Sequence, residues 1–259
     1  MTAFVLLRLA EIAAIVLFIL GLHFLSSPAT ARFGNRLAAA GMLIALVAAL
    51  GPSHVVGWWA ILIGIVAGTA VGLYSALKVK MTAMPQMVAL FNGAGGGAAA
   101  CVSTTQYLLW ERAHYAGVPL DVLTDVSLVI SAIIGAVSAA GSAIAFLKLQ
   151  ELMTGRPVTY RGQQFVNGLV ALAIAGLAAW VMVTLGVEPT WAYGVMVALA
   201  LVLGVMFVLP IGGADMPVVI SLLNSFTGLA VAITGFELRY NLLIIAGTLV
   251  GASGTMLTI

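Results

Sequence analysis

Nine apolar stretches, each about long enough to cross a lipid bilayer, follow one another along the chain. They lie at about 3–24, 34–50, 55–77, 83–109, 122–147, 165–185, 190–209, 216–235 and 241–258. A transmembrane helix needs about 20 predominantly apolar residues. Only 7% of the residues are charged, whereas soluble domains carry about 25%, so a water-soluble fold could not cover its surface. The sequence predicts an all-α fold, a polytopic membrane helix bundle with about nine transmembrane helices.

The segments between these stretches are short and rich in turn-forming residues. Six of them are Ser26-Ser27-Pro28, Gly51-Pro52-Ser53, Gly117-Val118-Pro119, Thr154-Gly155-Arg156-Pro157, Gly186-Val187-Glu188-Pro189 and Gly212-Gly213. Such clusters mark turns, so we expect successive helices to be antiparallel neighbours. Because no loop is long enough for a soluble domain, we expect residues 1–259 to form one transmembrane domain.

Basic residues are distributed unevenly between the two sides of the predicted bundle. Arg112 and Arg239 lie in the fourth and eighth loops. Seven others lie in the first, third and fifth loops: Arg32, Arg36, Lys78, Lys80, Lys148, Arg156 and Arg161. Cytoplasmic loops carry an excess of Lys and Arg. The bias predicts that the N-terminus is outside and, after nine crossings, that the C-terminus is in the cytoplasm.

One element occurs twice, 132 residues apart (216 − 84 = 132). The stretch from Met84-Pro85 to Asn92 shares its Met, Pro, Leu and Asn positions with the stretch from Met216-Pro217 to Asn224. Proline suits the first turn of a helix, and each Asn lies about 10 Å beyond its proline. The helices that follow also resemble each other, at Ile133-Ile134-Gly135-Ala136 and Leu249-Val250-Gly251-Ala252. The duplicated unit is therefore a candidate helix pair, repeated in parallel orientation.

Two interpretations of Asn92 and Asn224 stay open. A polar amide within a membrane is costly unless something satisfies it. Each Asn can form an interhelical hydrogen bond that fixes packing, worth about 0.6–2 kcal/mol. Alternatively, the pair forms a polar constriction that holds water or a proton relay, in which a neutral Asn orients water but cannot itself titrate.

A stripe of small residues runs along the fifth predicted helix. It consists of Ser127, Ser131, Gly135, Ser138 and Ser142, at helical spacing. The stripe can serve close helix packing or line a narrow wet path, and both can hold in one bundle. Ser131, Ser138 and Ser142 therefore join the two asparagines as candidate path residues.

Asp215 follows Gly212 and Gly213 at the predicted cytoplasmic start of the eighth helix. A carboxylate at a helix start interacts favourably with the helix dipole. The glycines permit unusual backbone angles and movement. A mobile loop with one carboxylate at this face is a candidate gate or docking point.

Other residues argue against several kinds of site. The single cysteine, Cys101, excludes an intrachain disulfide, and the histidines His23, His54 and His114 share no metal-ligand spacing. The sequence contains no phosphate loop or nucleotide fingerprint after a strand, and we expect no metal, no cofactor bound by this domain and no nucleic-acid partner. Arg8 and Glu11, three residues apart on the first helix, can pair.

The run Gly-Gly-Ala-Asp-Met-Pro-Val-Val that begins at Gly212, together with Leu249-Val250-Gly251-Ala252-Ser253-Gly254, resembles the membrane domain of the beta subunit of proton-translocating NAD(P) transhydrogenase. The resemblance covers essentially the whole chain. It implies an enzyme that moves a hydride from NADH to NADP+ and couples this to proton flow across a bacterial inner membrane. The membrane domain conducts the proton and is not catalytic alone.

The resemblance also implies partners. NADP(H) binds to a soluble domain that normally follows on the same polypeptide, so we expect the apolar end at Ile259 to be a domain boundary. NAD(H) binds to an alpha subunit, which also supplies membrane helices, and the whole assembly is a dimer.

By the same resemblance, Asn224 is the proton-path asparagine, and Asp215, with Gly212 and Gly213, lies near the interface with the NADP domain. Many bacterial relatives hold a histidine at the position of Asn92, and an Asn cannot take up a proton. Water, or a titrating group from a partner helix, would have to replace it. A secondary transporter of a small solute and a purely structural membrane anchor are the two alternative functions.

Overall fold

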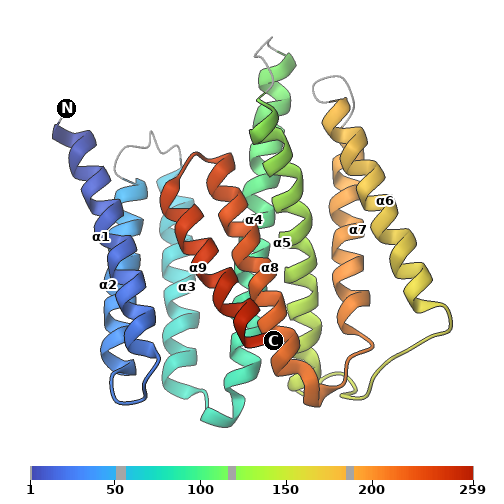
Figure 1. Cartoon of the computed structure of the whole chain (residues 1–259), viewed down its shortest axis with the longest axis horizontal. Helices are drawn as coiled ribbons and strands as arrows, with labels where there is room; N and C mark the ends of the chain where they lie inside the picture. Colours follow the sequence, from blue (N-terminus) through green and yellow to red (C-terminus); the bar gives the residue numbers. More distant parts are fainter. Residues whose placement is uncertain (1, 51–56, 116–120, 185–189, 259) are drawn as a thin grey trace. The chain divides into compact units, whose positions relative to one another are not determined.

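The computed structural model describes residues 2–50, 57–115, 121–184 and 190–258, and the secondary structure of this part is helical throughout (Figure 1). The long helices are α1 (Thr2–Leu25), α2 (Ala31–Leu50), α3 (Trp58–Lys78), α4 (Met84–Tyr115), α5 (Val122–Leu149), α6 (Gln163–Val183), α7 (Trp191–Val208), α8 (Met216–Glu237) and α9 (Asn241–Thr258). Within the described residues, nine helices are long and apolar enough to span a membrane. The predicted all-helical polytopic fold is confirmed.

The helix ends agree with the predicted ends to within three residues except at α4, which continues to Tyr115 rather than 109. The predicted span ended at 109, before the charged residues Glu111 and Arg112, and Arg112 was predicted to lie in a loop. In the structure Glu111 is buried and accepts a hydrogen bond from the Thr190 hydroxyl at 3.1 Å. Because its carboxylate is satisfied inside the protein, the helix can continue. The predicted breaks at 51–53, 117–119 and 186–189, and His54, lie outside the described residues.

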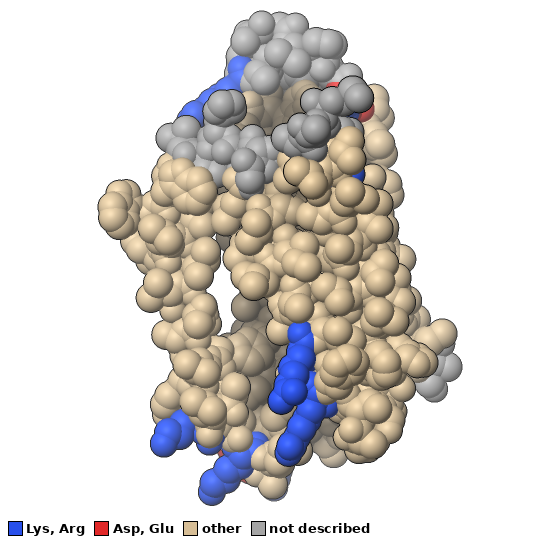
Figure 2. All heavy atoms as spheres, turned by 90° about the vertical axis from the view of Figure 1, so that its left-hand side faces the viewer, with Lys and Arg blue, Asp and Glu red and all other residues tan. Residues whose placement is uncertain are grey.

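The chain forms two compact units, residues 1–79 and 80–259. In the first unit α1 and α2 form a hairpin, packed so closely that a Cβ on Gly34 would lie 2.7 Å from the carbonyl oxygen of Gly21. The predicted pair on α1 forms, with 2.9 Å between Arg8 Nη1 and Glu11 Oε2. Figure 2 shows one face of the molecule, and most of the surface in this view carries neither basic nor acidic side chains. Such a surface suits contact with lipid or with other apolar helices.

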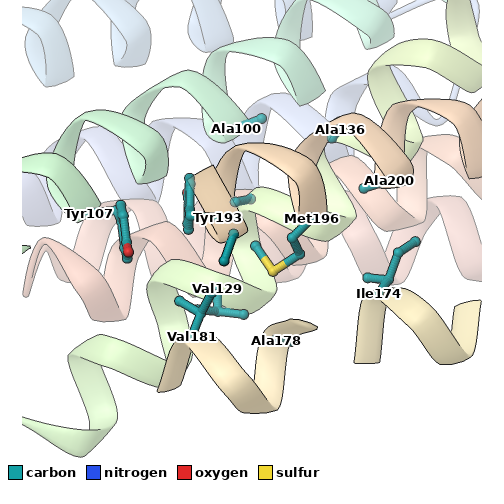
Figure 3. Packing of buried hydrophobic residues seen from close by; sticks show 12 residues of the cluster. Ala100, Tyr107, Val129, Ala136, Ile174, Ala178, Val181, Tyr193, Met196 and Ala200 are labelled. Carbon is teal, nitrogen blue, oxygen red and sulfur yellow. The ribbon is translucent and has the colours of Figure 1, made fainter. Parts of the chain in front are cut away.

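The second unit is built around α5, which packs against α4, α7 and α8. Helix α9 packs along α8, and α6 packs along α7 at the edge of the unit (Figure 1). Tyr107, Val129, Tyr193 and Met196 belong to an apolar cluster shared by α4, α5, α6 and α7, in which the rings of Tyr107 and Tyr193 stack at 3.9 Å (Figure 3). Much of the rest of this cluster is alanine, which lets the helix backbones approach closely.

The repeat seen in the sequence is a repeat in the structure. Short 3-10 turns, Met81–Ala83 and Gly213–Asp215, lead directly into α4 and α8 and are also 132 residues apart (213 − 81 = 132). Each helix then packs closely on the next one in the chain. A Cβ on Gly96 would lie 3.0 Å from the carbonyl oxygen of Gly135 on α5. A Cβ on Gly228 would lie 2.6 Å from the Cα of Gly251 on α9. The two helix pairs α4–α5 and α8–α9 therefore share an entry turn and a glycine contact.

The glycine contact of the second pair can be tested by Gly228→Ala. The added methyl group would meet backbone atoms of Gly247 and Gly251, which cannot move aside without separating α8 from α9. We expect a loss of about 1–3 kcal/mol and a lower midpoint of thermal unfolding, measured on the purified full-length subunit in detergent.

The matched control is Gly176→Ala on α6, where a Cβ meets nothing within 4 Å. Alanine is the better helix former by about 1 kcal/mol, so this variant should be neutral or slightly stabilised. Equal midpoints for the two variants would contradict the close contact between α8 and α9.

Candidate functional site

Hydrogen-bonded polar side chains lie buried between α4, α5 and α8. One cluster is centred on Asn92, which is 6% exposed. The Asn92 amide donates to the Ser142 hydroxyl at 2.8 Å and, more weakly, to Ser138 at 3.4 Å. Ser138 in turn contacts the Thr227 hydroxyl at 2.6 Å and donates to the Leu223 carbonyl at 2.9 Å. This cluster joins all three helices.

Two further clusters lie along the same helices. In the second, the hydroxyls of Ser131 on α5 and Thr234 on α8 are 2.7 Å apart, and Ser131 also donates to the Ala230 carbonyl. In the third, the Ser103 hydroxyl on α4 donates to Glu237 Oε2 at 2.8 Å. We call these residues together the polar column: Asn92, Ser103, Ser131, Ser138, Ser142, Thr227, Thr234 and Glu237.

The polar column has gaps. Thr227 and Thr234 are seven residues apart on α8, about 10 Å along its axis, and Glu237 is a further ~4.5 Å away. The hydroxyls of the first two clusters are therefore too far apart for a direct hydrogen bond. Two buried acceptors, Asn92 Oδ1 and Glu237 Oε1, have no hydrogen-bond partner within the described residues. Such acceptors suit water molecules, which can also bridge polar groups that lie beyond direct reach.

Of the five predicted path residues, the structure brings four into the polar column: Asn92, Ser131, Ser138 and Ser142. Asn224 is not among them. It is half-buried, and its amide faces α9, where the nearest acceptor is the Val250 carbonyl at 3.4 Å. The repeat explains the difference, because each Asn faces the second helix of its own pair. Asn92 faces α5 in the centre of the unit, whereas Asn224 faces α9, which packs mainly against α8.

Sequence reasoning missed four members of the polar column: Ser103, Thr227, Thr234 and Glu237. A signal for three of them was present on α8, since Thr227, Thr234 and Glu237 are seven and then three residues apart and so share one helix face. Glu237 was overlooked because a charged residue at the end of an apolar stretch resembles an ordinary boundary residue.

The segment 209–215 in front of α8 is held by the end of α5. Lys148 is 2% exposed, and its ammonium group donates to the carbonyl of Ile211 at 2.8 Å and to that of Leu209. The Gly213 N–H donates to the Gly155 carbonyl at 2.8 Å. Lys148 was predicted to lie in a loop, but it is a buried residue of α5 that binds two carbonyls just beyond the end of α7.

Asp215 is exposed at the N-cap position of α8, where its side chain makes no capping hydrogen bond. Its carboxylate is therefore accessible. The neighbouring Gly212 has an ordinary extended conformation with φ −72° and ψ 155°, so the turn in this structure does not use the backbone freedom that a glycine permits. A Cβ on Gly212 or Gly213 would meet only ordinary contacts.

An ion pair lies at the opposite end of α8. The guanidinium of Arg239 donates to Asp121 Oδ2 at 2.6 Å, and the Thr124 hydroxyl donates to the same oxygen at 2.8 Å. The hydrogen bond from Thr124, followed by that from Arg239, lowers the pKa of Asp121 below its ordinary value. The pair connects the start of α5 with the end of α8. Within the described residues, no group of three His, Cys, Asp or Glu side chains could hold a metal ion.

Comparison with known proteins identifies the family. The family model described as NAD(P) transhydrogenase beta subunit matches residues 7–259. Two relatives named NAD(P) transhydrogenase subunit beta, both from Rhodospirillum rubrum and one of them from a defined strain, are each 43% identical over 253 residues. The alignment covers 96% of this chain and 53% of each relative, so the chain spans about half the length of these relatives. The chain belongs to the family of NAD(P) transhydrogenase beta subunits.

Proposed function

We propose that this chain is the proton-conducting membrane domain of a transhydrogenase, in which proton translocation is coupled to hydride transfer between NADH and NADP+. The polar column is the observation that supports this proposal. A membrane bundle held together by packing alone needs no line of buried amide, hydroxyl and carboxyl groups, and polar groups inside a membrane are costly. Their alignment between α4, α5 and α8 is what a proton path requires.

The polar column suits protons better than larger solutes. Hydroxyl groups both donate and accept hydrogen bonds, so Ser138 and Thr227, at 2.6 Å, can reverse the direction of their hydrogen bond. The Asn92 amide fixes the orientation of Ser142 and leaves its own oxygen free to accept a hydrogen bond from water. A solute transporter needs a midplane cavity with broken helices, whereas α4, α5 and α8 run unbroken past the column.

The orientation follows from the basic residues. We propose that the N-terminus is outside and the C-terminus cytoplasmic, because Arg32, Arg36 and Lys78 lie at the ends of helices on the predicted cytoplasmic side. Asp215 then faces the cytoplasm and Glu237 lies toward the outer side. A cytoplasmic Asp215, exposed and without a capping bond, is accessible to a soluble domain.

We propose that the complete assembly contains parts beyond this chain. A soluble NADP(H)-binding domain follows this domain in the same subunit, an alpha subunit supplies the NAD(H) site and further helices, and the assembly is a dimer in the bacterial inner membrane. The family membership and the half-length match to the relatives support this arrangement. In this scheme residues 212–215 transmit changes between the NADP domain and α8.

The decisive experiment uses the full-length subunit and its partner subunit in sealed proteoliposomes. Reduction of an NADP analogue by NADH is followed with and without an uncoupler. If the proposal is correct, the rate rises when the proton gradient collapses, because hydride transfer is pumping protons. A rate indifferent to the gradient would show that the domain is a structural anchor, and gradient-driven solute uptake would show a transporter.

Asn92→Ala in the same assembly should lower coupled turnover by about tenfold or more, since it removes the amide that orients Ser138 and Ser142. We expect Asn224→Ala also to lower coupled turnover severely and to leave the fold largely intact. The measurement is the uncoupler-stimulated rate together with the proton flux per hydride transferred.

The matched control is Asn167→Ala on α6, which removes a buried amide oxygen away from the polar column and should retain coupled turnover. If Asn92→Ala pumps as well as this control, Asn92 is a packing residue and the proposed path is wrong at this position.

Asp215→Asn should disturb coupling to the NADP domain while leaving membrane insertion intact. The substitution keeps the size of an exposed side chain that makes no capping bond but removes its charge. We expect altered kinetics of NADPH release with a normal yield of membrane-embedded protein. Unchanged release kinetics would count against a role for Asp215 at the domain interface.

A further inference from the structure

A proton path needs a group that takes up and releases a proton, and the predicted asparagines cannot serve. Asn92 and Asn224 are neutral amides. The serine and threonine hydroxyls of the polar column can pass on a proton along hydrogen bonds, but they do not titrate in the physiological range. In the polar column, the remaining member is Glu237, whose carboxyl group can bind and release a proton.

Glu237 is well placed for this role. It is the last residue of α8 and is 6% exposed, although its side chain is ionisable. Ser103 of α4 donates a hydrogen bond to Oε2 at 2.8 Å, whereas Oε1 is buried and has no hydrogen-bond partner within the described residues. One oxygen is therefore fixed by a neutral donor, and the other is available to a proton or to water. Ionisable residues inside a membrane commonly mark proton and ion pathways.

The neighbouring basic residue does not neutralise Glu237. Arg239 follows two residues later, but its guanidinium is bonded to Asp121 at 2.6 Å on the exposed surface. On α7, the buried Tyr193 near the start of that helix stacks on Tyr107 of α4. The first turn of α5 contributes the buried carboxyl of Asp125 at the same end of the unit. Tyr240 follows α8 in the turn to α9.

The position of Glu237 along α8 also supports this role. Glu237 lies 22 residues after Asp215, so α8 separates the two carboxyl groups by about 33 Å, close to the thickness of a bilayer core. Thr234 lies one helical turn before Glu237 and contacts Ser131 at 2.7 Å. Glu237 therefore ends the polar column on the side away from Asp215.

We propose that Glu237 is the titratable group of the polar column, which exchanges the translocated proton with the membrane face opposite Asp215. This inference rests on the proposed function. The carboxylate binds one proton and becomes a neutral carboxyl group. It then donates that proton to water, or to a hydroxyl of the column that passes its own proton on to the next acceptor, and returns to the carboxylate. Ser103 is a positioning residue, since its hydrogen bond to Oε2 holds the carboxyl group at the end of the column.

The test is Glu237→Gln in the full-length subunit, assembled with its partner subunit in sealed proteoliposomes. Glutamine retains the size and the acceptor for Ser103 but cannot titrate. We expect proton-coupled hydride transfer to fall by about a hundredfold or more, as for other groups that transfer protons. Glu237→Asp keeps the carboxyl group, so it should retain part of the coupled activity, with a changed dependence on the pH of the compartment at the Glu237 side.

Glu111→Gln is the matched control. Glu111 is also a buried glutamate toward the same end of α4 and α7, 7% exposed and hydrogen bonded to a hydroxyl, that of Thr190, but it is not part of the polar column. This variant should pump within about twofold of the unchanged protein and should keep its pH profile, because its carboxylate serves only local packing.

The outcomes separate the two proposals. If the unchanged assembly transfers hydride at a rate indifferent to the uncoupler, the proposed function itself is wrong. If it is coupled and Glu237→Gln remains equally coupled with the same pH profile, the proton passes elsewhere and the inference about Glu237 is wrong. If Glu237→Gln fails to assemble, Glu237→Asp decides: coupled activity with an unchanged pH profile would also overturn the inference.

Discussion

Close contact between helix backbones is the interaction on which the second unit depends. Lipid is as apolar as the side chains it surrounds, so helices in a membrane associate through packing and interhelical hydrogen bonds rather than through the hydrophobic effect. Gly96 and Gly135 bring α4 onto α5, and Gly228, Gly247 and Gly251 bring α8 onto α9. Without these contacts the backbones would be separated, and short side chains could not reach across. The 2.8 Å hydrogen bond from Asn92 on α4 to Ser142 on α5 requires such proximity, because serine carries its hydroxyl only one carbon from the backbone.

The repeat contains two similar helix pairs, α4–α5 and α8–α9. Because different helices surround the two pairs, their asparagines are buried to different degrees. The entry turn, the Met-Pro start, the Asn and the glycine contact are present in both copies. However, α5 also packs against α7 and α8, whereas α9 packs mainly against α8. The same local geometry therefore buries Asn92 in a cluster of hydroxyls and leaves Asn224 half-buried at a carbonyl.

Much of the fold could be predicted from sequence because apolar length alone identifies a membrane helix. The main errors in the predicted helix boundaries occurred at charged residues. The predicted fourth span ended at 109, before Glu111, and Lys148 was expected to lie in a loop, but both residues are buried and hydrogen bonded in the structure. A hydropathy profile assigns charged residues to the aqueous phase, whereas a charged side chain that has a hydrogen-bond partner can be buried inside the protein. The stripe on α5 was predicted correctly as one helix face, yet its spacing could not show which helix lies opposite. Thr227, Thr234 and Ser103 therefore emerged only from the structure.

Helix α8 runs between the two ends of the proposed path, and the segments at both of its ends are hydrogen bonded to α5 or to the residue before it. At its start, Asp215 is exposed, and the preceding segment is bonded to Lys148 at the end of α5. At its end, Arg239 is bonded to Asp121 at the start of α5. The two helices are thus linked at both ends, and the hydroxyl pairs of the polar column lie between these links. A displacement of residues 209–215 therefore acts on α5 and α8 together. Since Ser138 and Thr227 are only 2.6 Å apart, a slide of one helix past the other by about an ångström would break or form such hydrogen bonds. Under the proposed function, this is a physical route from a soluble NADP domain to the proposed proton path.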